Sequence, residues 1–229
     1  MVRKNSLFLG LSLLLLAVLG WALLTIPKGE LHWLLCHDHT PARDLFYRYY
    51  THIAEWLPYV ICVAILLLSR IGDGVFATSC LVGSALTTQL FKHIINAPRP
   101  LTWFAANMPE VQLPLVEGVQ MNYWFSFPSG HTTSFFALFF AITIIATDKI
   151  SRSTSLPCPK TVSALVQILL FAMAALGGYS RIYLSQHFAA DVFGGILVGL
   201  LLSVVSYAIL SRYEGQKWYN YLVFAKKTP

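Results

Sequence analysis

Residues 187–210 read HFAADVFGGILVGLLLSVVSYAIL, a histidine followed by a long apolar segment that carries a single acidic residue, Asp191. The apolar part, 188–210, is near the ~20 residues that a helix needs to cross the hydrocarbon core of a bilayer. A helix suits that environment because it satisfies its backbone amides and carbonyls within one segment. The stretch therefore predicts a membrane-spanning helix with two ionisable residues, His187 and Asp191, near its start.

Five further apolar segments precede this one. They lie at about 6–26, 53–69, 74–96, 131–147 and 163–183. The composition agrees, because 56% of the 229 residues are hydrophobic, only 11% are charged and the mean hydropathy is +0.63, whereas about a quarter of the residues of a soluble domain are charged. We predict an all-α bundle of six transmembrane helices that forms one integral membrane domain over residues 1–229.

The first apolar segment follows Arg3 and Lys4 and could be mistaken for a signal peptide. Its apolar run is longer than a typical signal-peptide core and no clear small-residue cleavage site follows, so we expect an uncleaved helix.

Six crossings place both termini on one side of the membrane, and an excess of Lys and Arg marks the cytoplasmic side. The side of the termini holds Arg3, Lys4, Arg70, Lys149, Arg152, Lys160, Arg212, Lys217, Lys226 and Lys227. Six such residues lie on the other side, so we expect cytoplasmic termini.

Two connections on the opposite side are long, at about 28–51 and 97–128, and both are rich in aromatic residues that suit the headgroup region.

The formal charge of +6 is not gathered in a basic block with interleaved aromatics, so we expect no nucleic-acid partner. The cysteines show no CxxC spacing, which argues against a disulfide framework or a zinc site. They are Cys36, Cys62, Cys80 and Cys158.

The first polar constellation is Lys92-His-Ile-Ile-Asn-Ala-Pro-Arg99-Pro100, at the outer end of the third apolar segment. Lys92 and Arg99 are seven residues apart, so we expect them two turns apart on one helical face, with Arg99 at the mouth of the helix. The prolines stop the helix there. The alternative is that both cations only extend to the membrane interface.

The second constellation is Phe127-Pro128-Ser129-Gly130-His131, where the fourth helix begins. This sequence opens a helix and exposes backbone amides at its positive end, a geometry that binds phosphate. His131 lies one step inside, within reach of a leaving-group oxygen. The alternative is that Ser129 is an ordinary N-cap.

The third constellation is Ser180-Arg181-Ile-Tyr-Leu-Ser-Gln-His187-Phe-Ala-Ala-Asp191, between the fifth and sixth helices. His187 and Asp191 are four residues apart and share a face, so the carboxylate can accept the ring N–H and fix the tautomer. Arg181 offers a planar fork for phosphate oxygens. An aspartate inside a membrane is costly without a partner. The alternative is an unrelated histidine and aspartate at the interface.

By topology, all three constellations fall at one membrane face, because the third and fifth helices end there and the fourth and sixth begin there. Together they supply three cations and a helix start for an anion, with two histidines and an aspartate for acid–base chemistry. Such a set is typical of a phosphate-binding catalytic site.

The pattern Lys-x6-Arg-Pro, Pro-Ser-Gly-His and Ser-Arg-x5-His-x3-Asp resembles the type 2 phosphatidic acid phosphatase (PAP2) superfamily, with all motifs in order from Lys92 to Asp191. The resemblance implies a PAP2/haloperoxidase-like helical core and a phosphatase that needs neither metal nor cofactor. It implies that His187 attacks phosphorus to form a phosphohistidine, that Asp191 orients His187, and that His131 protonates the leaving group. The phosphoryl oxygens would be held by Lys92, Arg99, Ser129, Gly130 and Arg181.

The resemblance also implies a lipid substrate at the periplasmic face of a bacterial cytoplasmic membrane. The whole chain is similar to compact lipid A 4′-phosphatases, so lipid A is the expected substrate, with undecaprenyl diphosphate and phosphatidylglycerophosphate as alternatives. Vanadate-dependent haloperoxidases share the cradle but are soluble. A transporter or structural membrane protein with a degenerate site is a further alternative, which would lack phosphatase activity. The sequence does not indicate the oligomeric state.

Other polar residues fit the site less well. His37-Asp38-His39 lacks the spacing of a closed metal site, so we expect structural or interfacial roles. His93 follows Lys92 and is expected to point elsewhere on the helix. We expect the glycines of the last helix to allow close helix packing rather than to take part in catalysis. They are Gly194, Gly195 and Gly199.

Overall fold

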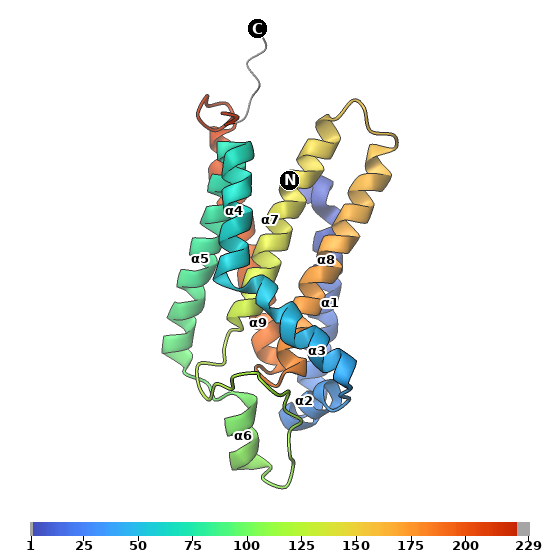
Figure 1. The fold of residues 1–229 in the computed structure, drawn as a ribbon, viewed down its shortest axis with the longest axis vertical. Helices are drawn as coiled ribbons and strands as arrows, with labels where there is room; N and C mark the ends of the chain where they lie inside the picture. The colour runs from blue at the N-terminus through green and yellow to red at the C-terminus, as the bar shows by residue number, and fades with distance from the viewer. Residues whose placement is uncertain (1, 224–229) are drawn as a thin grey trace.

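The computed structural model describes residues 2–223, and every regular element in that range is a helix (Figure 1). The six apolar segments correspond to α1 (Ser6–Thr25), α4 (Trp56–Ser69), α5 (Ile71–Ile95), α7 (Gly130–Arg152), α8 (Pro159–Tyr183) and α9 (Ala189–Leu210). Shorter helices occupy the two long connections: α2 (Lys28–Cys36), α3 (Pro41–Tyr50) and α6 (Pro100–Asn107). Three 3₁₀ turns complete the described chain: η1 (Val2–Asn5), η2 (Thr51–Ala54) and η3 (Ser211–Tyr213). The all-α fold class is confirmed.

The second crossing is shorter than predicted. Within residues 2–223, five helical segments are long and apolar enough to span a membrane, and a sixth is reached if Pro41–Ala54 and Trp56–Ser69 form one crossing bent by 50°. The predicted start at residue 53 is wrong, because Glu55 is extended and α4 begins at Trp56. Pro58 has no backbone N–H and is tolerated only in the first turn of a helix, which explains this start.

The two ends of the bundle differ in their cover (Figure 1). α1 begins and α9 ends at the upper end in this view, whereas α2, α3 and α6 lie around the lower end. The lower end is also where α5 and α8 end and where α7 and α9 begin. The three polar constellations therefore lie at the covered end of the bundle.

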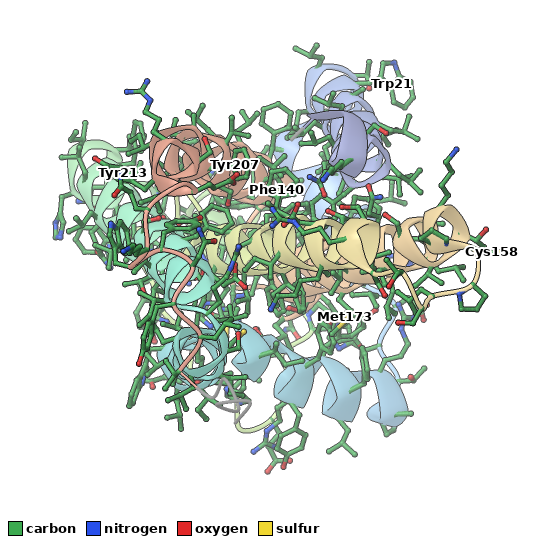
Figure 2. The ribbon with its side chains drawn as sticks, turned by 90° about the horizontal axis from the view of Figure 1, so that it is seen from above. Trp21, Phe140, Cys158, Met173, Tyr207 and Tyr213 are labelled. Atoms are coloured by element: carbon green, nitrogen blue, oxygen red, sulfur yellow. The ribbon has the colours of Figure 1, made fainter. Side chains whose placement is uncertain are left out.

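Helix α7 forms the centre of the bundle, in contact with α5, α8 and α9. Its Phe135, Phe136 and Phe140 are fully buried, and Phe8 of α1 stacks on Phe140 with ring centroids 5.1 Å apart. Viewed from above, Phe140 lies in the interior while Trp21 of α1 lies at the periphery, 66% exposed (Figure 2). Large apolar side chains exposed on the outer helices suit contact with lipid tails.

Two glycines allow α9 to lie directly against α7. A Cβ added at Gly195 would lie 2.8 Å from the carbonyl oxygen of Ser129, and one at Gly199 would lie 2.7 Å from that of Thr133. Both neighbours are backbone atoms, which cannot move aside as the end of a side chain can. The interpretation of these two glycines as packing residues is confirmed.

We expect Gly199→Ala to destabilise the protein, because the added methyl overpacks the α7–α9 contact at a typical cost of about 1–3 kcal/mol. Gly10→Ala on α1 is the matched control, since a Cβ there meets nothing within 4 Å. The thermal unfolding midpoint in detergent should fall for Gly199→Ala and stay at or above the wild-type value for Gly10→Ala. Equal midpoints for the two variants would contradict this packing argument.

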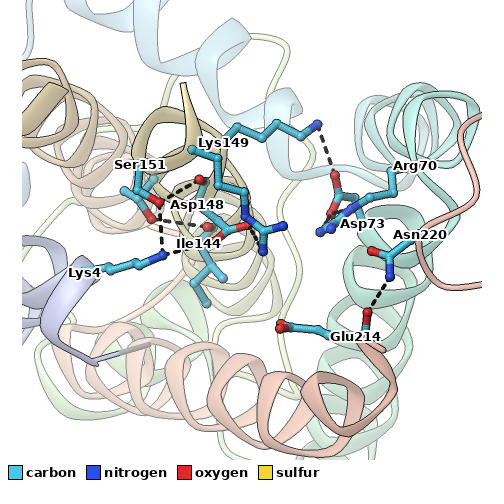
Figure 3. A network of polar contacts seen from close by, with 11 residues as sticks. Lys4, Arg70, Asp73, Ile144, Asp148, Lys149, Ser151, Glu214 and Asn220 are labelled. Atoms are coloured by element: carbon cyan, nitrogen blue, oxygen red, sulfur yellow. Dashed lines mark hydrogen bonds and ion pairs between the residues drawn. The ribbon is translucent and has the colours of Figure 1, made fainter. Parts of the chain in front are cut away.

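Ion pairs join the helices at the end opposite the polar constellations (Figure 3). Lys4 Nζ lies 3.2 Å from Asp148 Oδ1, and Lys149 Nζ lies 3.1 Å from Asp73 Oδ2. Asp73 is only 1% exposed and also pairs with Arg70. Several of the cations counted for orientation therefore lie together at this end. Lys226 and Lys227, which were also counted, lie outside the described residues.

Candidate active site

The start of α7 is a capped helix terminus. Ser129 is the N-cap, and its Oγ accepts hydrogen bonds from the backbone N of Thr132 at 3.4 Å and from the Oγ1 of Thr132 at 2.9 Å. The backbone N of Ser129 donates to the carbonyl oxygen of Asp191 at 3.0 Å, which joins this terminus to α9. The hydroxyl of Ser129 is thus buried and engaged, as the N-cap interpretation predicts, so the first-turn amides rather than this hydroxyl are the groups suited to an anion.

Arg99 reaches the site from a different element than predicted. Helix α5 ends at Ile95, Asn96 is left-handed with φ 42°, and Arg99 is the N-cap of α6. The expectation that Lys92 and Arg99 share one helical face is therefore wrong. Pro98 disfavours helical backbone at the residue before it, and an asparagine at the C-cap readily turns the chain left-handed.

The guanidinium of Arg99 is nevertheless fixed in the interior, with the residue 6% exposed. Its Nε donates to the carbonyl oxygen of Trp124 at 2.9 Å, and its Nη1 donates to the carbonyl oxygen and the Oε1 of Gln186 at 3.2 and 3.1 Å. Gln186 directly precedes His187. Arg99 therefore links the 97–128 connection to the segment that carries His187.

Arg181, at the end of α8, is 6% exposed. Its Nη1 donates to the Oγ1 of Thr51 at 2.6 Å. Its Nε is buried and has no hydrogen-bond partner among residues 2–223. A buried donor without an acceptor is costly, so this N–H is suited to an incoming anion.

His187 and Asp191 form the predicted pair. His187 is 1% exposed, and its Nδ1 lies 3.5 Å from the Oδ2 of Asp191 and 3.5 Å from the Oγ of Ser126. The same Oδ2 accepts hydrogen bonds from Ser126 Oγ at 2.5 Å and from the backbone N of Phe188 at 2.8 Å. Because Nδ1 faces the carboxylate, Nε2 is the ring nitrogen left for chemistry.

Burial lowers the pKa of His187 below its usual value of 6.5, and the positive charges of Arg99 and Arg181 lower it further, against the opposing effect of Asp191. A lowered pKa keeps the imidazole neutral near pH 7. A neutral ring with a free nitrogen is the form that acts as a nucleophile.

Lys92 and His131 line a cavity of about 340 Å³ beside α4, α5 and α7. Lys92 lies close enough to Arg99 and Arg181 to be repelled by their like charges, and close enough to Asp191 to be attracted by its carboxylate. His131 likewise lies within electrostatic range of His187, Arg181 and Lys92. The structure thus brings together the side chains of all three constellations at one end of the bundle, with three cations and one buried carboxylate in the group.

The segment that carries His187 rests on α2, in the connection predicted only as an aromatic loop. His32 is 1% exposed, and its Nε2 lies 3.4 Å from the Oγ of Ser185, which has a left-handed backbone with φ 49°. Lys28 Nζ lies 4.0 Å from the centroid of the Phe188 ring. Burial lowers the pKa of His32 to about 4, so this ring is a neutral packing partner.

Sequence reasoning missed the residues that hold the predicted ones in place. Ser126 immediately precedes the Phe127–His131 constellation, and this position is the signal that could have identified it. Gln186 lies within the third constellation, but at a position that the motif leaves open. Thr51 and His32 belong to no motif, and only the tertiary structure brings them to the site.

Two other predicted features lie apart from this group. His93 contacts the ring of Phe125, with centroids 5.2 Å apart, as expected for a side chain on another face. The side chains of 37–39 each find a different partner. His37 Nδ1 contacts the carbonyl oxygen of Trp33 at 3.0 Å, Asp38 pairs with Arg43, and His39 Nδ1 contacts Asp44 Oδ1 at 2.7 Å.

Two bacterial proteins are similar to the chain in sequence. It is 25% identical over 183 residues to a lipid A 4′-phosphatase of Porphyromonas gingivalis, a match that covers 78% of this chain and 70% of that protein. It is 38% identical over 78 residues to phosphatidylglycerophosphatase B of Bacillus subtilis. That match covers 34% of this chain and 36% of the relative, so it spans only about a third of either protein.

Two crystal structures share the fold. A transmembrane PAP2-type phosphatidylglycerolphosphate phosphatase from Bacillus subtilis superposes with a TM-score of 0.64 at 25% identity, over 95% of this chain and 100% of that chain. Aquifex aeolicus LpxE superposes with a TM-score of 0.61 at 24% identity, over 78% and 93%. Both likenesses support a multi-pass helical membrane protein.

The PAP2 superfamily model matches residues 73–214, which is more than half of the chain and includes every predicted site residue. The resemblance inferred from the three motifs is thus confirmed: the chain belongs to the PAP2 superfamily.

Proposed function

We propose that this protein is a membrane lipid phosphatase that hydrolyses a phosphate ester through a phosphohistidine on His187. The observation that carries the proposal is the buried Nε of Arg181, which has no acceptor within the described part of the chain and lies near a histidine whose Nδ1 faces a carboxylate. A phosphoryl oxygen supplies the acceptor, and Nε2 of His187 supplies the nucleophile.

In the first step, Nε2 of His187 attacks phosphorus, and the new P–N bond forms as the P–O bond to the leaving group breaks. The imidazolium of His131 gives its proton to the departing oxygen. Lys92, Arg99 and Arg181, with the amides at the start of α7, stabilise charge on the equatorial oxygens, which is the main catalytic task in phosphoryl transfer.

In the second step, water attacks the phosphorus of the phosphohistidine. The proton of the water passes to His131, the P–N bond breaks, and inorganic phosphate leaves. His187 returns to its neutral form, held by Asp191, and His131 returns to its imidazolium form, so the cycle closes without a net change in the enzyme.

The proposal includes no metal ion. Magnesium prefers carboxylates and other oxygen ligands, whereas this site offers three cations and two carboxylates that are already engaged: Asp191 accepts from Ser126 and Phe188, and Glu55 Oε1 lies 2.6 Å from His52 Nδ1. We expect phosphate release to continue in excess chelator. Vanadate, which mimics the trigonal-bipyramidal phosphoryl group, is expected to inhibit.

Lipid A is the first proposed substrate, supported by the likeness to the Porphyromonas gingivalis lipid A 4′-phosphatase over 78% of the chain. Phosphatidylglycerophosphate is the second, supported by the likeness to the Bacillus subtilis structure over 95% of the chain. Undecaprenyl diphosphate remains a third candidate. We also propose that residues 1–229 form one domain. The distribution of Lys and Arg supports cytoplasmic termini and a periplasmic active site.

The decisive experiment is a panel assay of phosphate release by the purified protein, with these three lipids at a matched detergent ratio. Release from at least one lipid, in the presence of chelator, is the expected result. A transporter or a degenerate relative would release phosphate from none. A strain without the gene should accumulate the lipid that the purified enzyme prefers.

The lowered pKa of His187 leads to a prediction about pH. The acid limb of kcat/KM reports a group on the free enzyme that must be deprotonated, so the limb due to His187 should lie well below pH 6.5. The substrate phosphate also titrates near pH 6, so two substrates with different phosphate pKa values should be compared. An acid limb with the same midpoint for both substrates, at or above pH 6.5, would contradict the prediction.

A further inference from the structure

The cavity beside Lys92 and His131 lies where a leaving group would be expected. This inference rests on the proposed function, in which His187 attacks and His131 protonates the departing oxygen. An in-line displacement places the leaving oxygen opposite the nucleophile. His131 and Gly130 line the cavity and His187 does not. The part of the substrate that departs from phosphorus therefore falls toward this space.

Two side-chain hydroxyl groups of α5 that line this cavity are buried but form no hydrogen bond with the described residues. Ser84 is 2% exposed and Thr88 is 4% exposed, and both line the cavity. Neither hydroxyl has a hydrogen-bond partner anywhere in residues 2–223. In a helix, a serine or threonine hydroxyl commonly bonds to a carbonyl three or four residues earlier.

The preceding hydroxyls of the same helix follow that rule. Thr78 Oγ1 donates to the carbonyl oxygen of Gly74 at 2.8 Å, and Ser79 Oγ donates to that of Phe76 at 2.8 Å. Ser84 and Thr88, one turn apart, instead leave donors and acceptors directed to the cavity. Buried polar groups left unpaired are destabilising, so they indicate a polar ligand.

The rest of the cavity wall agrees with a hydroxylated ligand. Gln89 and Ser134 add donors and acceptors, and Glu55, whose Oε1 lies 2.6 Å from His52 Nδ1, keeps Oε2 as an acceptor for hydroxyl groups. The volume of about 340 Å³ is within the range of small-molecule sites.

We propose that Ser84 and Thr88 bind hydroxyl groups of the leaving group. The preferred substrate then carries its phosphate on a sugar or a glycerol that keeps at least one free hydroxyl, and not on an alcohol without further hydroxyls or on a second phosphate. Lipid A and phosphatidylglycerophosphate belong to the first class, and phosphatidic acid and undecaprenyl diphosphate belong to the second.

The test compares the Ser84→Ala/Thr88→Val variant with the wild type on phosphatidylglycerophosphate and on phosphatidic acid with the same acyl chains. Phosphatidylglycerol leaves with one further free hydroxyl, whereas diacylglycerol leaves with none. We expect kcat/KM to fall about 10- to 100-fold on the first lipid and less than about 3-fold on the second, which offers no hydroxyl to lose. Lipid A and undecaprenyl diphosphate extend the two arms to a sugar and to a diphosphate.

Two further variants separate binding from folding. Thr88→Ser keeps a hydroxyl and should keep near-wild-type selectivity, while Ser79→Ala, whose hydroxyl already has a partner, should change neither substrate. An equal loss on both lipids, a loss confined to the diphosphate, or no loss on any lipid that the wild type cleaves would overturn the inference and leave the proposed function standing. A wild-type protein that releases phosphate from none of them would end both.

Discussion

Replacing His187 with alanine should lower phosphate release by about 10⁵- to 10⁶-fold, the loss seen when a nucleophile is removed from a covalent mechanism. The side chain is 1% exposed, and its Nδ1 lies 3.5 Å from both Asp191 Oδ2 and Ser126 Oγ. The assay is single-turnover and steady-state release of phosphate from the best lipid of the panel.

The matched control for this variant is His93→Ala. His93 is exposed and directly follows Lys92, yet its ring contacts Phe125 and not the site, so its activity should match the wild type. Rapid quenching should trap acid-labile phosphate on the wild-type protein and not on His187→Ala. Turnover that survives the removal of His187 would end the proposed mechanism.

The second largest effect is expected for Asp191→Asn, about a 10³- to 10⁴-fold fall in kcat, as when an aspartate that orients a catalytic histidine loses its charge. The amide oxygen of asparagine can still accept from Phe188 N and Ser126 Oγ, so the local fold should persist. The ring of His187, however, then faces a neutral amide oxygen, which holds its proton on Nδ1 less firmly and no longer stabilises the positive charge that the ring gains in the phosphohistidine.

Ser126→Ala is the control for this effect. It removes one hydrogen bond to the carboxylate without removing the charge, so we expect only about a 10-fold loss. Asp191→Glu keeps the charge but lengthens the side chain and should fall between the two. The order of kcat for the three variants, with unfolding midpoints as a check on stability, tests whether charge and tautomer matter. A variant with asparagine as active as the wild type would contradict the assigned role of Asp191.

The bundle and the gathering of the site were predictable for different reasons. Apolar segments of about 20 residues predict helices, because within lipid a single segment can satisfy its backbone hydrogen bonds only as a helix. The convergence of the three motifs follows from counting crossings, since alternate helix ends must share a face. His187 and Asp191 are only four residues apart at the start of a helix. Helix geometry alone therefore places their side chains on the same face.

The features that were missed depend on contacts distant in sequence or on small shifts of a helix end. The helix-face argument for Arg99 failed because α5 stops four residues before it, and a face has no meaning beyond the last turn. Thr51 meets Arg181 across 130 positions of sequence. His32 meets Ser185 across 153 positions. No pattern within either segment predicts such pairs, because packing of whole helices decides them.

The shortness of α4 has a consequence for the surrounding lipid. Its 14 residues rise only about 21 Å, against a hydrocarbon thickness of about 30 Å. Hydrophobic mismatch of this size is relieved when the adjacent leaflet thins or tilts toward the shorter helix. Trp56 and Glu55, at the outer end of α4, also border the cavity that contains Lys92 and His131. The bilayer should therefore be thinnest beside that opening, where a depressed leaflet brings headgroups down to the depth of the catalytic side chains.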